Sequence, residues 1–156
     1  MKKHYVLFAI VTIMVSCSEK AKNEPESSTP TTIEGTWKLL TGTIIEKGDT
    51  TVTDYTKNKS FIKIINDSHF AFLLHDLSNG KDSSSAEFSA GGGSYSLTGN
   101  NYTEHLEYCN AREWEGHDFS FTITITGDTL IQSGVEKIEA QGINRINIEN
   151  YVRIKK

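Results

Sequence analysis

The sequence predicts an all-β fold, an up-and-down antiparallel barrel of about 8–10 strands. The first observation is strict alternation at 119–126, where Phe and Ile residues occupy every second position and Ser or Thr the others. The second is a set of two-residue turn signals between such runs, including Gly99-Asn100 and Gly127-Asp128. The third is that apolar residues nowhere recur at helical spacing over a length that could form a packed helix.

Taken along the chain, alternation and turn signals place strands at 35–45, 50–56, 60–66, 69–75, 86–90, 95–98, 101–109, 119–126, 129–133 and 146–154. The segments 111–117 and 135–140 could each form a single helical turn. Because most connections are tight turns, a meander closing into a barrel is favoured over a two-sheet sandwich, which usually requires long crossovers.

Size and charge narrow the class of protein further. The chain has 156 residues, enough for one domain with a real core, and its hydrophobic content of 37% is that of a globular protein. The net charge of −4 and the lack of a basic patch argue against nucleic acid as a partner.

The N-terminus predicts export. Residues 1–16 carry a short positive head, Lys2-Lys3, an apolar run too short to span a bilayer, and a small residue, Ser16. Because Cys17 follows directly, the segment resembles a bacterial lipoprotein signal, and that resemblance implies cleavage before Cys17 and acylation of its thiol. The alternative is an ordinary signal peptide that ends near a cysteine.

Residues 17–32 complete the anchor in this prediction. They contain both prolines of the chain and no large apolar residue, so they are expected to form a flexible tether between lipid and the domain at 33–156. The expected location is the cell envelope, with the outer membrane favoured and its side left open. With Cys17 acylated, Cys109 has no intramolecular disulfide partner, so the domain relies on its core.

The first and last predicted strands carry a recognisable pair. Gly35-Thr36-Trp37 lies on the first and Arg153 on the last. The arrangement resembles that of lipocalins and their calycin relatives, in which an arginine from a late strand stacks on the tryptophan of a Gly-x-Trp motif. The resemblance implies that Trp37 and Arg153 close one end of the barrel.

A second likeness covers most of 33–156. Residues 61–70, 90–95 and 101–104 are similar to those of uncharacterised lipocalin-like lipoproteins from Bacteroidetes-type bacteria. This resemblance implies a fold, a compartment and a general binding role, but no defined ligand.

Barrels of this size can enclose one small ligand, so residues expected to face inward are candidates for its binding site. One predicted strand carries Tyr102, Glu104, Leu106 and Tyr108 on a single face. A buried Glu104 would need a partner, which could be a ligand or a side chain such as Arg145. The candidate ligand-binding residues are Phe72, Tyr95, Tyr102, Glu104, Phe119 and Phe121.

Chemical motifs are sparse. His69 and His75 share a strand face but lie about 20 Å apart at the strand rise, so they cannot bind one ion, and no zinc site is predicted. No cofactor fingerprint or nucleophile motif occurs, and Gly91-Gly92-Gly93 is expected to bend a strand rather than bind phosphate.

Three functions remain open at this point. The leading hypothesis is an anchored envelope protein whose barrel binds a small apolar or amphipathic molecule. The second is an interaction module with a filled barrel, whose loops contact protein or glycan. The third is an enzyme that uses the barrel pocket; catalysis is the least favoured, and no catalytic residue is assigned.

Overall fold

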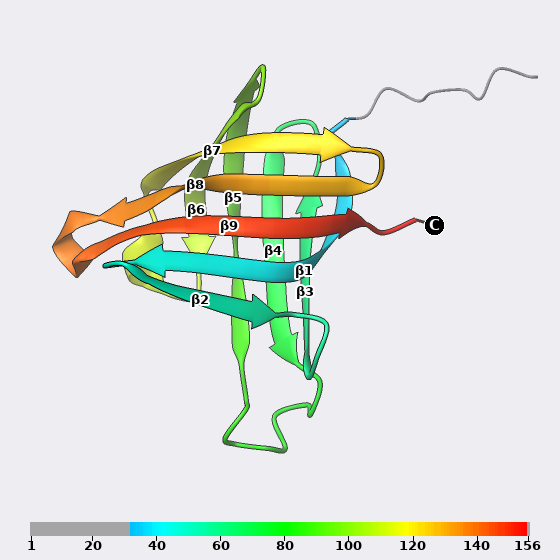
Figure 1. The fold of residues 1–156 in the computed structure, drawn as a ribbon, viewed down its shortest axis with the longest axis vertical. Helices are drawn as coiled ribbons and strands as arrows, with labels where there is room; N and C mark the ends of the chain where they lie inside the picture. The colour runs from blue at the N-terminus through cyan, green and yellow to red at the C-terminus, as the bar shows by residue number, and fades with distance from the viewer. Residues whose placement is uncertain (1–31, 156) are drawn as a thin grey trace, which may run out of the picture.

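The computed structural model describes residues 32–155. The predicted signal peptide (1–16), the predicted acylation site Cys17 and all but the last residue of the predicted tether (17–32) lie outside the described residues. The described chain is one antiparallel sheet of nine strands with two short 3-10 turns (Figure 1). The strands are β1 (Gly35–Glu46), β2 (Asp49–Asp54), β3 (Lys59–Ile65), β4 (His69–Asp76), β5 (Phe88–Thr98), β6 (Asn101–Cys109), β7 (His117–Thr126), β8 (Thr129–Ile138) and β9 (Ile143–Arg153).

The sheet closes on itself. Strands β3 to β9 follow one another as a meander, and β1 pairs with both β3 and β9, so eight strands form a closed barrel. The remaining strand, β2, pairs only with β1 and lies outside the closed ring. The predicted fold class, an all-β up-and-down barrel, is therefore confirmed.

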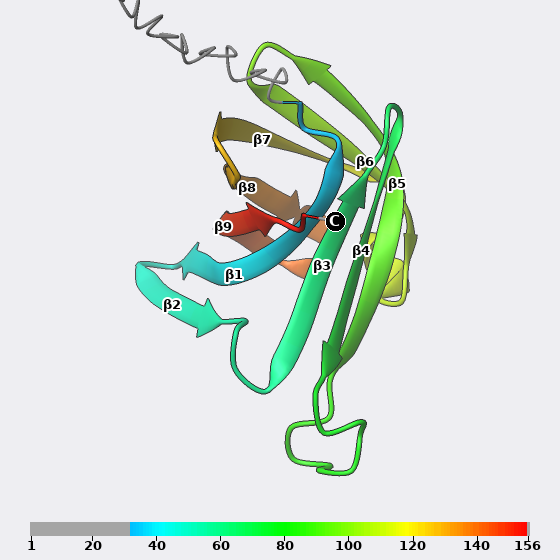
Figure 2. The same ribbon diagram turned by 90° about the vertical axis from the view of Figure 1, so that its right-hand side faces the viewer.

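One edge of strand β1 changes its pairing partner along the strand, and this makes the two ends of the barrel different. Its beginning pairs with β3, from Gly35 opposite Ile65 to Lys38 opposite Ile62. Its end pairs instead with β2, so that β1 and β2 diverge together from β3 and β4 (Figure 2). The barrel wall is consequently continuous at the end where β1 begins and looser where β1 finishes.

The continuous end is closed by the predicted pair. The Arg153 guanidinium lies 4.0 Å from the centre of the fully buried Trp37 ring. It also donates hydrogen bonds to the carbonyls of Glu34 and Thr32, while the Trp37 indole donates to Ile33. Gly35 makes this possible, because a Cβ there would come within 2.5 Å of the guanidinium.

The glycine run bends a continuous strand. The sequence predicts separate strands at 86–90 and 95–98, whereas β5 runs unbroken through both, with a register shift between Gly92 and Gly93 opposite β6. A Cβ at Gly93 would lie 2.0 Å from the His105 carbonyl oxygen, so only glycine permits this approach of the two backbones. The expected role as a strand bend is confirmed.

The same bulge overturns one prediction about β6. Gly92 pairs with Tyr108 and Gly93 with Leu106, so Glu107 is the extra residue of the bulge. Its insertion reverses the alternation, and Tyr108 points outward with 68% of its surface exposed. Tyr102, Glu104 and Leu106 share the inner face as expected, but Tyr108 does not join them.

Of the two predicted helical turns, the first is shorter than expected and most of the second is replaced by strand. The first is a 3-10 turn at Arg112–Trp114. In place of the second, β8 continues to Ile138 and a 3-10 turn follows at Glu139–Gln141. The reason is that β8 extends to pair with β9 as far as Ile138 opposite Ile143, which a helical turn at 135–140 would prevent.

Candidate ligand cavity

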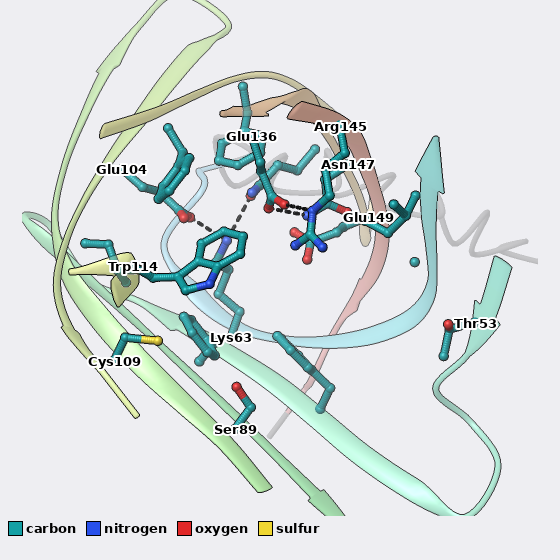
Figure 3. Close-up of a pocket in the computed structure, with 18 of the residues that line it drawn as sticks. Thr53, Lys63, Ser89, Glu104, Cys109, Trp114, Glu136, Arg145, Asn147 and Glu149 are labelled. Atoms are coloured by element: carbon teal, nitrogen blue, oxygen red, sulfur yellow. Dashed lines mark hydrogen bonds and ion pairs between the residues drawn. The ribbon is translucent and has the colours of Figure 1, made fainter. Parts of the chain in front are cut away.

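Half of the barrel is filled and half is hollow. At the closed end, buried apolar side chains pack around Trp37, Phe70, Tyr102, Ile123 and Leu130. At the other end, a partly enclosed cavity of about 360 Å³ remains inside the barrel (Figure 3). This volume lies within the range of small-molecule sites.

The cavity has an aromatic wall and a polar wall. The aromatic and aliphatic lining comprises Tyr55, Phe61, Phe72, Leu106, Trp114, Phe119, Phe121 and Tyr151. The polar lining comprises Lys63, Glu104, Gln132, Glu136, Arg145, Asn147 and Glu149. Strand alternation produces both walls, because every second residue of each strand faces the interior.

Lys63 is the central charged group of the polar wall. Its Nζ lies 2.5 Å from Glu104 Oε1 and donates to Gln132 Oε1 at 3.0 Å, and all three residues are buried. The ammonium also lies 5.4–5.7 Å from the centres of three aromatic rings, those of Phe70, Tyr102 and Tyr151. The partner of Glu104 is thus a side chain, Lys63 of β3, and not Arg145, which the sequence offered as one example.

A second ion pair lies on β8 and β9. Arg145 Nε donates to Glu136 Oε2 at 2.6 Å, and Asn147 Nδ2 donates to Glu136 Oε1 at 2.8 Å. The Arg145 guanidinium also lies 5.0 Å from the centre of the Trp114 ring. Both oxygens of Glu136 are thus used, one by Arg145 and one by Asn147, which fixes the Arg145 side chain. The cation–π contact then holds Trp114, and the 3-10 turn that carries it, against the polar wall.

Glu149 completes the polar wall without a cation of its own. Its Oε2 accepts a hydrogen bond from the Tyr151 hydroxyl at 2.8 Å, and no ion pair involves it among residues 32–155. Burial raises the pKa of Glu149 above its ordinary value, although the nearby Lys63 charge acts in the opposite direction. Burial and the Glu149 charge likewise raise the pKa of Tyr151, so its hydroxyl remains a donor.

The structure places four of the six predicted binding residues on the cavity: Phe72, Glu104, Phe119 and Phe121. Tyr102 is fully buried in the filled half, and its hydroxyl has no hydrogen-bond partner among residues 32–155. Burial, followed by the charge of Glu104, raises the pKa of Tyr102. Tyr95 lies at the closed end, where its hydroxyl donates to the Asn66 carbonyl at 2.7 Å and its ring borders a separate surface hollow.

Sequence reasoning missed most of the polar wall. Lys63 has the same strand parity as the buried Phe61 and Ile65, and Glu149 has the same parity as the buried Tyr151. The available signal for an inward side chain was therefore its position an even number of residues from a buried apolar residue on the same strand. It was weak because charged residues in antiparallel strands normally mark the solvent face.

Other chemistry is limited in the part of the chain that the structure describes. No group of three or more His, Cys, Asp or Glu side chains there is arranged to hold a metal ion. His105 and Asp118 form an exposed pair, with Nδ1 and Oδ1 2.6 Å apart. Within residues 32–155 no helix has the length and apolarity needed to cross a membrane.

Comparison with known proteins identified no family for this chain. No family model, curated protein or solved structure matches the chain. The functional argument therefore rests on the cavity and its lining.

Proposed function

We propose that this chain is a lipid-anchored envelope protein of lipocalin-like type whose barrel binds a small, partly apolar molecule. The observation that carries the proposal is the cavity of about 360 Å³, with aromatic rings on one side and fixed polar groups on the other. Such a combination is typical of small-molecule sites, where apolar walls supply affinity and a few polar groups orient the ligand.

The aromatic wall supports an apolar part of the ligand. Phe61 contacts Tyr55 edge-on and stacks on Phe72, with ring centres 5.6 and 5.9 Å apart. The ring centres of Trp114 and Phe119, which line the same cavity, are 5.6 Å apart. These rings constrain one another, so a bound molecule would meet a preformed surface and lose little free energy to ordering it.

Binding can be tested with N-phenyl-1-naphthylamine, a neutral apolar fluorophore that brightens in apolar sites. We expect saturable binding by the domain and loss of binding in Ser89→Trp, which places a large ring in the cavity lining. Thr124→Trp, on the exposed face of β7, is the matched control and should bind as the unmodified protein does. Equal binding by both variants would show that the dye does not enter the cavity.

The natural ligand can be sought directly. Protein purified from its native host under mild conditions should release a small molecule on denaturation, detectable by mass spectrometry. The Ser89→Trp variant, prepared in parallel, should release none. A molecule recovered equally from both preparations would not be a cavity ligand.

The anchor needs a separate experiment. Cys17→Ala removes the thiol that would be acylated, so the protein should move from the membrane fraction to the soluble fraction on fractionation of the host cells. Cys109→Ala is the matched cysteine control and should leave the distribution unchanged. Retention of the Cys17→Ala protein in the membrane fraction would remove the anchor from the proposal.

An envelope interaction module is the second candidate. Exposed apolar residues are present on β3 to β6: Ile64, Leu73, Phe88 and Tyr108. Exposed apolar surface of this kind often contacts a partner. Polar substitutions at Phe88 and Tyr108 would test this role, because they lie outside the cavity and should leave dye binding intact.

A further inference from the structure

We propose that the ligand of this cavity carries a cationic group, a protonated amine on an apolar body, which is bound by Glu149. This inference names the ligand class and rests on the proposed function. It follows from the charges inside the barrel, from the position of Glu149 and from the aromatic rings beside it.

The first step is the charge balance of the lining. Five ionisable acidic or basic side chains face the cavity, and four of them are paired as Lys63 with Glu104 and Arg145 with Glu136. The fifth, Glu149, has no ion-pair partner among residues 32–155. An ionised carboxylate inside a protein normally has a cation or several donors, whereas here a single tyrosine hydroxyl donates to it.

The second step is the position of Glu149. It lies deep in the barrel, yet its side chain keeps a partly accessible surface because it borders the cavity. In Figure 3 the side chain extends inward from β9, beside Arg145 and Asn147. A molecule inside the cavity can therefore reach the carboxylate without displacing either established ion pair.

The third step is the chemistry next to the carboxylate. The hydroxyl of Tyr151 donates to Glu149, and the centre of its ring lies 6.3 Å from that of Phe61. Phe61 in turn contacts Tyr55 and Phe72. Tyr55 lines the same cavity, where burial and then the Glu149 charge raise its pKa. A carboxylate bordered by aromatic faces matches an ammonium group attached to an apolar chain.

The surrounding charges set the expected pH dependence. Burial raises the pKa of Glu149; the charges of Glu104 and Glu136 raise it further, and the Lys63 charge and the hydrogen bond from Tyr151 lower it. Arg145 and Tyr55 line the same cavity. Since burial raises its pKa, an incoming amine should bind more tightly as the pH rises and Glu149 ionises. A primary alkylamine, with a pKa of about 10, remains charged throughout this range.

The test measures displacement of N-phenyl-1-naphthylamine by octylamine, octanol and octanoate at equal ionic strength. These three molecules share one chain length and differ in head-group charge. The unmodified domain should prefer octylamine over octanol by about tenfold or more, the scale of a charge-assisted hydrogen bond in a site of low polarity. Octanoate should displace the dye least well.

Glu149→Gln keeps the shape of the side chain and removes its charge. In this variant octylamine should lose its advantage over octanol, each measured as displacement of the dye from the same variant. Glu107→Gln, on the outer bulge of β6, is the matched control and should retain the preference. Denaturation curves of both variants establish that they are folded.

The outcomes distinguish failure of the proposed function, ligand binding in the barrel, from failure of the cationic ligand class. Failure of the dye to bind to the unmodified domain would overturn the proposed function. Dye binding with equal affinity for octylamine and octanol, or an amine preference that persists in Glu149→Gln, would overturn the cationic ligand alone. Loss of the preference in Glu107→Gln would show that the effect is not specific to Glu149, which would also overturn it.

Discussion

Lys63 and Glu104 are 41 residues apart in the sequence and meet inside the barrel at 2.5 Å. Both side chains are almost completely buried, at 3% and 10% exposure. Taking two charges out of water is costly, and their mutual attraction offsets that cost only while both are present. Burial of either charge is therefore tolerated only because the other is present.

Replacing Lys63 with methionine should destabilise the protein by about 3–5 kcal/mol, because it leaves Glu104 buried without a cation. The double variant Lys63→Met/Glu104→Gln should recover a substantial part of that loss. Urea denaturation of the single and double variants measures both quantities. A Lys63→Met protein as stable as the unmodified one would contradict the assignment of Lys63 as the counter-ion of Glu104.

Glu149 predicts a pH effect of definite sign. Because burial raises its pKa in the folded protein above the ordinary 4.5, the folded state binds this proton more tightly than the unfolded chain. Its contribution to stability is therefore greatest at low pH and is lost as the pH rises from about 4.5 through the raised value.

Glu149→Gln should remove that dependence. The variant's stability relative to the unmodified protein should increase from about pH 4 to about pH 8, measured by denaturation in the absence of ligand. Asp54 and Asp76 have pKa values lowered to about 2 and act in the opposite direction, but only at lower pH. A stability difference that does not vary with pH would mean that Glu149 titrates normally.

At the level of elements, the β5–β6 bulge determines which residues face the cavity. The inserted Glu107 leaves Leu106 inside and moves Tyr108 to the surface. The Glu107 carboxylate accepts hydrogen bonds from the backbone N–H and the hydroxyl of Ser94 on the neighbouring strand β5, which holds the bulge on the outer side. The glycines opposite are needed for the close approach of the two backbones.

Gly93→Ala should be more destabilising than Gly99→Ala. At Gly93 the added Cβ would meet the backbone of β6, which cannot move without loss of strand pairing. At Gly99 the space is open and the cost is the strain of a positive φ of 62°, about 1 kcal/mol. Equal losses in denaturation experiments would show that the bulge tolerates a side chain.

At the level of the whole molecule, β1 and β9 close the barrel, and Arg153 fastens the closure at one end. Its guanidinium covers Trp37 and donates to the carbonyls that precede β1, so it joins the last strand to the segment before the first. The opposite end, where β1 pairs with β2, has no such closure and contains the cavity.

Arg153→Ala should therefore lower stability by about 1–3 kcal/mol, from loss of the cation–π contact and two charge-assisted hydrogen bonds. Arg153→Lys keeps the charge but not the two-pronged geometry, so an intermediate loss is expected. Lys47→Ala, with a side chain 82% exposed, is the control and should change stability by less than about 0.5 kcal/mol. An effect of Arg153→Ala no larger than this control would exclude a role in closure.

The strands could be predicted because their signals are local. Phe119 and Phe121 alternate with serine and threonine, and alternation in a strand reports the two faces of the sheet directly. The turn at Gly99-Asn100 was likewise readable from residue types, whereas the Trp37–Arg153 contact was implied by the resemblance to lipocalins.

The composition of the cavity could not be read in this way. Glu104 was recognised as an inward carboxylate, but its partner Lys63 depends on the register of strands that meet across the barrel. Tyr108 was placed on the wrong face because the register shift opposite the glycines changes parity without a local signal that identifies its position. Sequence by itself determined the barrel, since strand periodicity is a property of neighbouring residues. Only the tertiary structure decided which charges are paired and that Glu149 is not, because that depends on distances between strands far apart in the chain.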